Sequence, residues 1–124
     1  MNDNEKNHRK MWQWIAEETR RRKRHVEKFE YFKAFGIPKW KRPYCDCYAC
    51  EEAGQRARDD GYDVDYDDLM ECDYCPIDWN NGKKCVEDGA LFRDWRHARS
   101  YEEAAKFAEK IAMMEWRNTD ERAD

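Results

Sequence analysis

Four cysteines arranged in two Cys-x-x-Cys pairs are the residues with the clearest chemistry in this sequence. Cys47 and Cys50 form the first pair, and Cys72 and Cys75 form the second. Two thiols separated by two residues can reach the same ion, and two such pairs supply the four sulfurs typical of tetrahedral structural zinc. Disulfides are the competing interpretation, but they are rare in the reducing cytosol. The spacing therefore predicts a structural Zn²⁺ site formed by these four thiolates.

Two further cysteines fall outside the paired pattern. Cys85 follows the sequence NNGKK at 80–84, a tight turn that can bring its thiol back towards the predicted site. We expect Cys85 either to replace one of the four ligands or to lie directly beside the metal. Cys45 is expected to take no part in metal binding.

A site closed by four thiolates indicates a structural metal, because catalytic zinc keeps one coordination position open. His25-x-Glu27 followed by Cys47-x-x-Cys50 partly matches the nucleobase deaminase signature, but Asp46 stands where that signature has proline. The sequence contains no evident nucleophile–base pair or phosphate-binding loop. We therefore expect no enzymatic activity and no small-molecule substrate.

The composition is unusual for a folded protein and requires a compensating feature. Leu, Ile, Val and Phe together account for only 14 of the 124 residues, while 42% of residues are charged, a balance typical of disorder. Eighteen aromatic residues, six of them Trp, can bury large apolar surfaces, and a metal can cross-link a thin core. We predict one zinc-stabilised domain over residues 1–124, with flexible ends at 1–6 and 118–124.

The hydrophobic periodicity indicates a mostly α fold. Residues 7–35 carry apolar side chains at helical spacing, and Gly36 and Pro38 supply a stop signal. Residues 91–96 indicate a short helix, and Ser100 with Glu103 forms a capping box for a C-terminal helix. We predict a long N-terminal helix and a C-terminal helix packed around a four-cysteine zinc knuckle, with little β structure.

Charge is segregated along the chain, although the net charge is only −4. Two basic clusters in the first third could follow a phosphate backbone or face a protein partner. An acidic cluster in the middle could contact a basic patch on a partner protein. The basic surface consists of Arg20, Arg21, Arg22, Lys23, Arg24, Lys39, Trp40, Lys41 and Arg42, and the acidic surface of Asp63, Asp65, Asp67 and Asp68.

The sequence contains neither the apolar segment of a secretory signal at its start nor an apolar run of about 20 residues that could span a membrane. We therefore expect an intracellular protein, in the cytoplasm, with no membrane contact.

Most of the chain resembles a group of small accessory proteins encoded by tailed bacteriophages, because several of its motifs occur in the same order and at similar spacing in that group. The resemblance covers roughly residues 11–117, and its most specific element is Cys-x-x-Cys-Pro-Ile-x-Trp at 72–79. Cys45 and the long acidic insert depart from the pattern. The other matching elements are Trp12-x-Trp14-Ile15, Cys47-x-x-Cys50-Glu51, Cys85, Trp95 and Glu103-Ala104-Ala105.

The resemblance implies a zinc-binding phage protein, with Cys47, Cys50, Cys72 and Cys75 as the matching ligand positions and Cys85 at a position where the group tends to have cysteine. The resemblance implies that the protein acts in the cytoplasm of an infected host cell. It does not indicate a particular activity. The leading hypothesis is a non-enzymatic protein that binds and modulates a host or defence protein. The alternative is a nucleic-acid-binding zinc protein that uses the basic N-terminal helix.

Overall fold

The computed structural model describes residues 2–43, 46–61, 75–77, 79, 85 and 89–117 of the chain. In this part of the chain the fold is mostly helical and contains no strand. The helices are α1 (Asp3–Arg22), α2 (Lys28–Ala34), the 3₁₀ turn η1 (Lys39–Lys41), α3 (Tyr48–Asp59), α5 (Leu91–Arg96) and α6 (Tyr101–Ala112).

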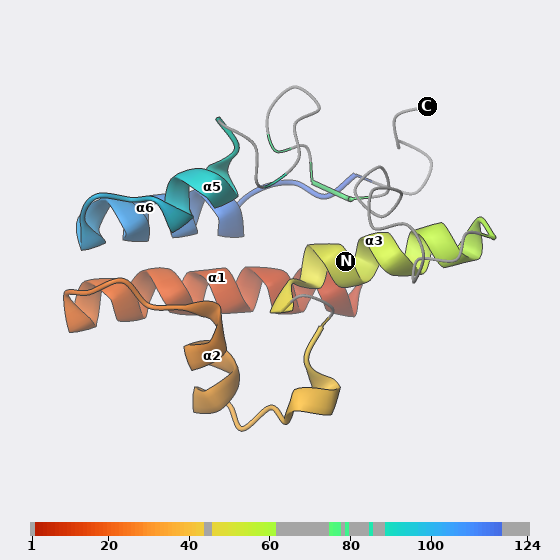
Figure 1. The fold of residues 1–124 in the computed structure, drawn as a ribbon, viewed down its shortest axis with the longest axis horizontal. Coiled ribbons are helices and arrows are strands. Elements are labelled where there is room, and N and C mark those ends of the chain that lie inside the picture. Colours follow the sequence, from red (N-terminus) through yellow and green to blue (C-terminus); the bar gives the residue numbers. More distant parts are fainter. Residues whose placement is uncertain are drawn as a thin grey trace.

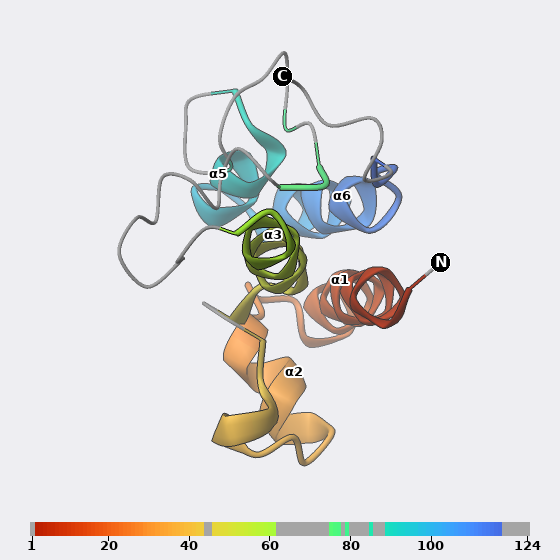
Figure 2. The same cartoon turned by 90° about the vertical axis from the view of Figure 1, so that its right-hand side faces the viewer.

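The helices lie in three tiers. Helices α1 and α3 form the middle tier, α5 and α6 lie on one side of it, and α2 with η1 projects on the opposite side (Figures 1 and 2). The most extensive helix contact joins α1 to α6, followed by α5 with α6 and α1 with α3. The long N-terminal helix and the C-terminal helix therefore pack directly on each other.

Small side chains allow α6 to pack closely on α1. Four alanines of α6 are fully buried, as is Ile111, and the opposing face of α1 presents Met11, Ile15 and Ala16. Helix α6 begins as the capping box predicts, because Ser100 Oγ accepts a hydrogen bond from the Glu103 amide at 3.1 Å. The buried alanines are Ala104, Ala105, Ala108 and Ala112.

Aromatic rings supply the bulk that the scarce aliphatic residues do not. The Trp12 and Trp95 rings are both buried and meet edge to face, with 4.8 Å between their centroids. Phe92 lies beside both, at 6.2 Å from Trp12 and 5.8 Å from Trp95. Edge-to-face contacts of this kind add about 0.5–1.5 kcal/mol to the burial of the rings. The prediction of a short helix at 91–96 is confirmed, and Trp95 is its buried residue.

The predicted helix over residues 7–35 is wrong as a single element, because two helices cover this range. Helix α1 ends at Arg22, Lys23 takes the left-handed conformation at φ 56°, and α2 begins at Lys28. Five consecutive basic residues leave this stretch without an apolar contact that could hold a straight helix on the core. Val26 in the connection is fully buried instead, and Glu27 with Glu30 forms a capping box that starts α2.

A buried ionic network joins the start of α1 to α3. Glu52 and Arg56 are one helical turn apart on α3, and the Arg56 Nε–Glu52 Oε2 distance is 2.8 Å. The side-chain amides of Asn2 and Asn4 donate to the other Glu52 oxygen at 3.0 and 3.1 Å. Both charged side chains are less than a tenth exposed, so these hydrogen bonds offset the cost of removing them from water.

Candidate functional site

The first cysteine pair lies at the start of α3. Cys47 occupies the N-cap position, and its Sγ accepts a hydrogen bond from the Cys50 amide at 3.4 Å. A hydrogen bond from the Cys50 thiol, the nearby charge of Lys28 and the helix amides lower the pKa of Cys47. The same contact raises the pKa of Cys50, as does its burial. Of the two thiols, that of Cys47 is therefore the one that loses its proton more readily.

Cys75 and Cys85 belong to the same cluster of thiols. The negative charges of Cys47, Cys75 and Cys85 add to the causes that raise the pKa of Cys50, so all three lie within electrostatic reach of it. All four thiols are partly buried, and Cys47, Cys75 and Cys85 pack against the hydrophobic core. Thiols from three separate segments of the chain therefore lie within electrostatic range of Cys50, in the first turn of α3.

The segment that carries Cys75 is anchored by the chain that follows α6. Arg117 Nη2 donates to the Cys75 carbonyl at 2.7 Å, and the Arg117 amide donates to the Pro76 carbonyl at 2.8 Å. Ile77 and Trp79 are buried in the core beside it. Arg117 thereby fixes the backbone of Cys75 and Pro76 through two hydrogen bonds.

The predicted ligand set is only partly covered by the described residues. Cys47, Cys50 and Cys75 are described, whereas Cys72 and the unpaired Cys45 lie outside the described residues. Within the part of the chain that the structure describes, no three His, Cys, Asp or Glu side chains meet as a metal-ligand group. The thiol donor set around Cys50 nevertheless has the chemistry that zinc prefers.

The first predicted basic cluster is extensively paired with carboxylates. Arg20 pairs with Glu109 of α6, Arg21 and Arg22 pair with Glu18, and Arg22 and Arg24 pair with Glu30 of α2. The hydrogen bond from Arg24 is the main reason that the pKa of Glu30 falls to about 2. These contacts join the end of α1 to its neighbours and reduce the positive charge available to an external polyanion.

The second predicted basic cluster behaves differently. Lys39, Trp40 and Lys41 form η1 at the outer edge of the projecting tier, and the Trp40 side chain is 83% exposed. Arg42 is directed inwards, because its guanidinium lies 5.3 Å from the Phe32 ring centroid and its Nε donates to the Ile37 carbonyl at 3.4 Å. The structure separates η1 from the arginines at the end of α1 (Figure 1).

The predicted acidic surface, Asp63, Asp65, Asp67 and Asp68, lies outside the described residues. His25 belongs to the partial deaminase signature. Its ring packs against the Trp95 ring, tilted by 34° with 4.7 Å between centroids, and its Nε2 lies 3.3 Å from Glu27 Oε1.

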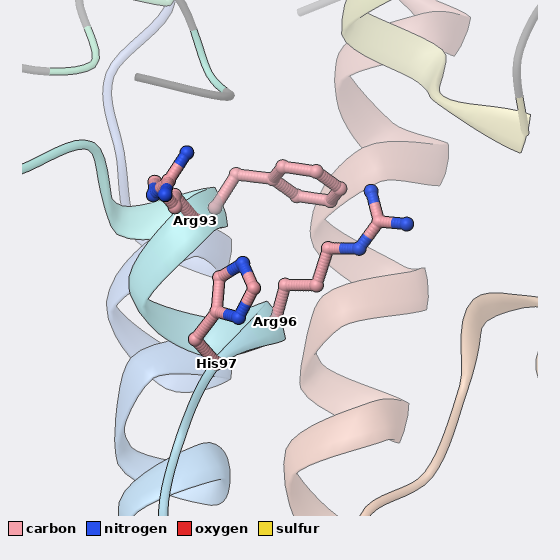
Figure 3. A pocket seen from close by; sticks show the side chains of 4 residues that line it. Arg93, Arg96 and His97 are labelled. Atoms are coloured by element: carbon pink, nitrogen blue, oxygen red, sulfur yellow. The ribbon is translucent and has the colours of Figure 1, made fainter. Parts of the chain in front are cut away.

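A pocket beside α5 with basic side chains in its lining was not predicted from the sequence. Phe92, Arg93, Arg96 and His97 line it (Figure 3). The available signal was the spacing of the three basic residues, which places Arg93, Arg96 and His97 on neighbouring positions of one helical turn.

Comparisons of the chain with models of known protein families, with curated proteins and with solved structures find no match. No helix among the described residues is long and apolar enough to cross a membrane.

Proposed function

We propose that this chain is a non-enzymatic, zinc-stabilised helical protein that binds and modulates another protein. The phage setting implied by the resemblance makes a host or defence protein the proposed target. The observation that carries the proposal is the exposure of Trp40, which stands between Lys39 and Lys41 on η1. In a protein with so few apolar residues, a Trp held away from the core is a costly use of apolar surface.

The surroundings of Trp40 suggest the chemistry of the partner. Trp is the side chain most often found at the energetic centre of protein interfaces, where it fills an apolar pocket. Phe29 of α2 and Phe35, the residue directly after α2, are also about half exposed, so the projecting tier offers further apolar area. Lys39 and Lys41 flank the ring, so the complementary site is an apolar pocket with carboxylates at its rim.

Structural zinc is the second part of the proposal. Cys47, Cys50, Cys72 and Cys75 are the proposed ligands, and the proximity of Cys85 to Cys50 supports the expectation that Cys85 lies beside the metal or replaces a ligand. A zinc ion would cross-link α3 to the segment around Cys75 and so stabilise the middle of the chain.

Nucleic acid remains the alternative partner, because an exposed Trp between two lysines can also stack on a base. The pairing of Arg20, Arg21, Arg22 and Arg24 with carboxylates argues against the end of α1 as a phosphate-binding surface. Lys39 and Lys41 of η1 would then be the two side chains that contact the phosphate backbone of the nucleic acid. We therefore expect a weak affinity that depends little on salt concentration.

The test compares the wild type with Trp40→Ala and with Met113→Ala, a matched change at another exposed apolar residue. A stoichiometric protein captured from host lysate is purified, and its affinity for the three proteins is measured by calorimetry. We expect Trp40→Ala to weaken binding by at least about tenfold, and Met113→Ala to have little effect. Loss of affinity for labelled single-stranded DNA, without a protein partner, would favour the alternative. Equal affinity of all three proteins for the partner would overturn the assignment of η1.

A further inference from the structure

The cysteines proposed to bind zinc are held by the fold in two different ways. Cys47 and Cys50 lie at the N-cap and in the first turn of α3, so the helix itself fixes their spacing. Cys75 lies in a segment, 75–77, that belongs to no helix or strand. Its main chain therefore needs partners from elsewhere in the fold, because carbonyl groups removed from water cost free energy unless they accept hydrogen bonds.

Arg117 supplies these partners with both its side chain and its main chain. Its Nη2 donates to the Cys75 carbonyl at 2.7 Å, and its amide donates to the Pro76 carbonyl at 2.8 Å. The first bond has a charged donor, and such bonds are stronger than those between neutral groups. Because the two bonds hold consecutive carbonyl groups, they fix the direction of the chain at Cys75 as well as its position.

The chain after α6 brings Arg117 to this place. It continues along α1 towards the start of that helix (Figure 1). The Trp116 ring meets the buried His8 ring at 5.3 Å between centroids, and Arg9 Nη2 donates to the Met114 carbonyl at 3.5 Å. Arg117 is therefore presented to the Cys75 segment from the contact between α1 and α6.

The guanidinium of Arg117 also brings a positive charge to Cys75. Its Nε is buried and has no hydrogen-bond partner among the residues that the structure describes. The carbonyl and the sulfur of Cys75 belong to one residue, so the charge lies within the roughly 10 Å over which charges interact in salt solution. A zinc ion with four thiolates carries a net negative charge, which a neighbouring cation stabilises.

We propose that Arg117 is a positioning residue of the zinc site. By fixing the main chain of Cys75 it presents this thiolate to the metal, and it makes the affinity for zinc depend on the chain after α6. The inference rests on the proposed zinc site and is independent of Trp40. Arg117 itself does not bind the metal, because a guanidinium has no free electron pair to donate.

The first experiment measures the zinc affinity of the full chain under reducing conditions, by competition with a chromogenic chelator. Arg117→Met keeps the aliphatic stem but removes the side-chain donor and the charge. We expect it to weaken zinc binding at least about tenfold, the usual cost of losing a residue that orients a metal ligand. Arg117→Lys keeps the charge and a donor, so its affinity should stay within about threefold of the wild type.

Arg20→Ala is the matched control. It removes the same charge and a contact with α6, because Arg20 pairs with Glu109. Arg20 lies about 18 Å along α1 from His8, which contacts the residue before Arg117. We expect this variant to change the zinc affinity less than about twofold.

A second measurement distinguishes positioning from a loss of general stability. Co²⁺ replaces Zn²⁺, and the visible absorption of the metal-saturated protein reports the geometry of the thiolate ligands. We expect an altered spectrum in Arg117→Met and the wild-type spectrum in Arg20→Ala. If circular dichroism shows that zinc-free Arg117→Met is less helical than the zinc-free wild type, Arg117→Gln replaces it in both measurements, and the same direction of change is expected.

Two results would overturn the role of Arg117 and leave the zinc site intact. One is the wild-type zinc affinity in Arg117→Met. The other is an equal loss of affinity in Arg117→Met and Arg20→Ala, which would indicate an effect of overall charge or stability. Elemental analysis that finds no zinc in the wild-type protein would instead overturn the zinc site and the role of Arg117 together.

Discussion

The imidazole of His8, near the start of α1, donates a hydrogen bond from Nε2 to the carbonyl oxygen of Ile111, in the last turn of α6, at 3.1 Å. Because a carbonyl can only accept, Nε2 carries the proton and Nδ1 is the unprotonated nitrogen of the neutral ring. Nδ1 is buried and has no hydrogen-bond partner among the residues that the structure describes, and the Trp116 ring lies edge-on to the imidazole at 5.3 Å between centroids. His8 is therefore held in its neutral form inside the contact between α1 and α6.

This burial predicts that the protein loses stability as the pH falls below neutrality. Burial lowers the pKa of His8 from 6.5 to about 4, with a smaller contribution from the positive charge of Arg9. Between these values the unfolded chain binds a proton and the folded chain does not, so the free energy of unfolding decreases as the pH falls from 6.5 to 4. We expect a loss of about 2 kcal/mol between pH 7.5 and pH 5, measured by urea unfolding followed by tryptophan fluorescence.

His8→Gln is the test variant, because glutamine keeps an amide donor for Ile111 but does not titrate in this range. Its unfolding free energy should vary less with pH than that of the wild type, whereas His97→Gln, at an exposed position, should keep the wild-type slope. Glu30, whose pKa is lowered to about 2 mainly by the hydrogen bond from Arg24, stabilises the fold above pH 4.5 and loses this effect only at lower pH. An unchanged slope in His8→Gln would show that another group causes the dependence.

The buried pair of Glu52 and Arg56 predicts that replacing one partner destabilises the protein much more than replacing both. Glu52→Ala leaves the Arg56 guanidinium buried without its carboxylate, so we expect a loss of about 3 kcal/mol in chemical unfolding. Replacing both residues by leucine removes the buried charges together and should recover much of this loss. Glu51→Ala is the control, because the pair of Glu51 with Arg58 is longer, at 3.9 Å, and more exposed. A similar small effect of Glu51→Ala and Glu52→Ala would contradict the network.

The cysteine cluster predicts that the proposed zinc contributes directly to folding. Protein purified under reducing conditions should contain about one zinc ion per chain by elemental analysis. Cys75→Ser or a strong chelator should remove it and reduce the helical circular dichroism signal, because metal binding energy becomes folding energy. Cys45→Ser is the control and should keep the metal, while Cys85→Ser tests whether Cys85 is a ligand. Metal-free protein with an unchanged melting temperature would refute the site.

Local features of the sequence predict much of the helical structure. Three features follow from residues within a few positions of one another. They are the start of α6 at Ser100 and Glu103, the short helix that contains Trp95, and the left-handed conformation of Gly36. The high aromatic content likewise predicts a core in which aromatic rings bury much of the apolar surface. The break at Lys23 was not predicted, because the burial of Val26 depends on contacts with distant parts of the chain.

The candidate site shows the same division between local and distant signals. The spacing of Cys47 and Cys50 predicts two thiols close together, and this is a property of four adjacent residues, whereas their place at the start of α3 was not predicted. The charge available on the basic cluster is not local, because Arg20 pairs with Glu109, which is 89 positions away. The partners of Glu52 are similarly distant, since Asn2 and Asn4 lie 50 and 48 residues before it. A count of charges along the chain therefore overestimates the surface that a polyanion can reach.

The left-handed residue at the end of α1 predicts a stabilising substitution that distinguishes two helices from one. Lys23 has φ 56° and ψ 39°, a conformation that costs most residues with a Cβ about 1 kcal/mol and glycine little. Lys23→Gly should therefore raise the free energy of unfolding by about 0.5–1 kcal/mol, measured by urea unfolding. Lys23→Ala removes the same charge but keeps the Cβ, so it should give no such gain. In a continuous helix over residues 7–35 the order would be reversed, because glycine within a helix costs about 1 kcal/mol relative to alanine.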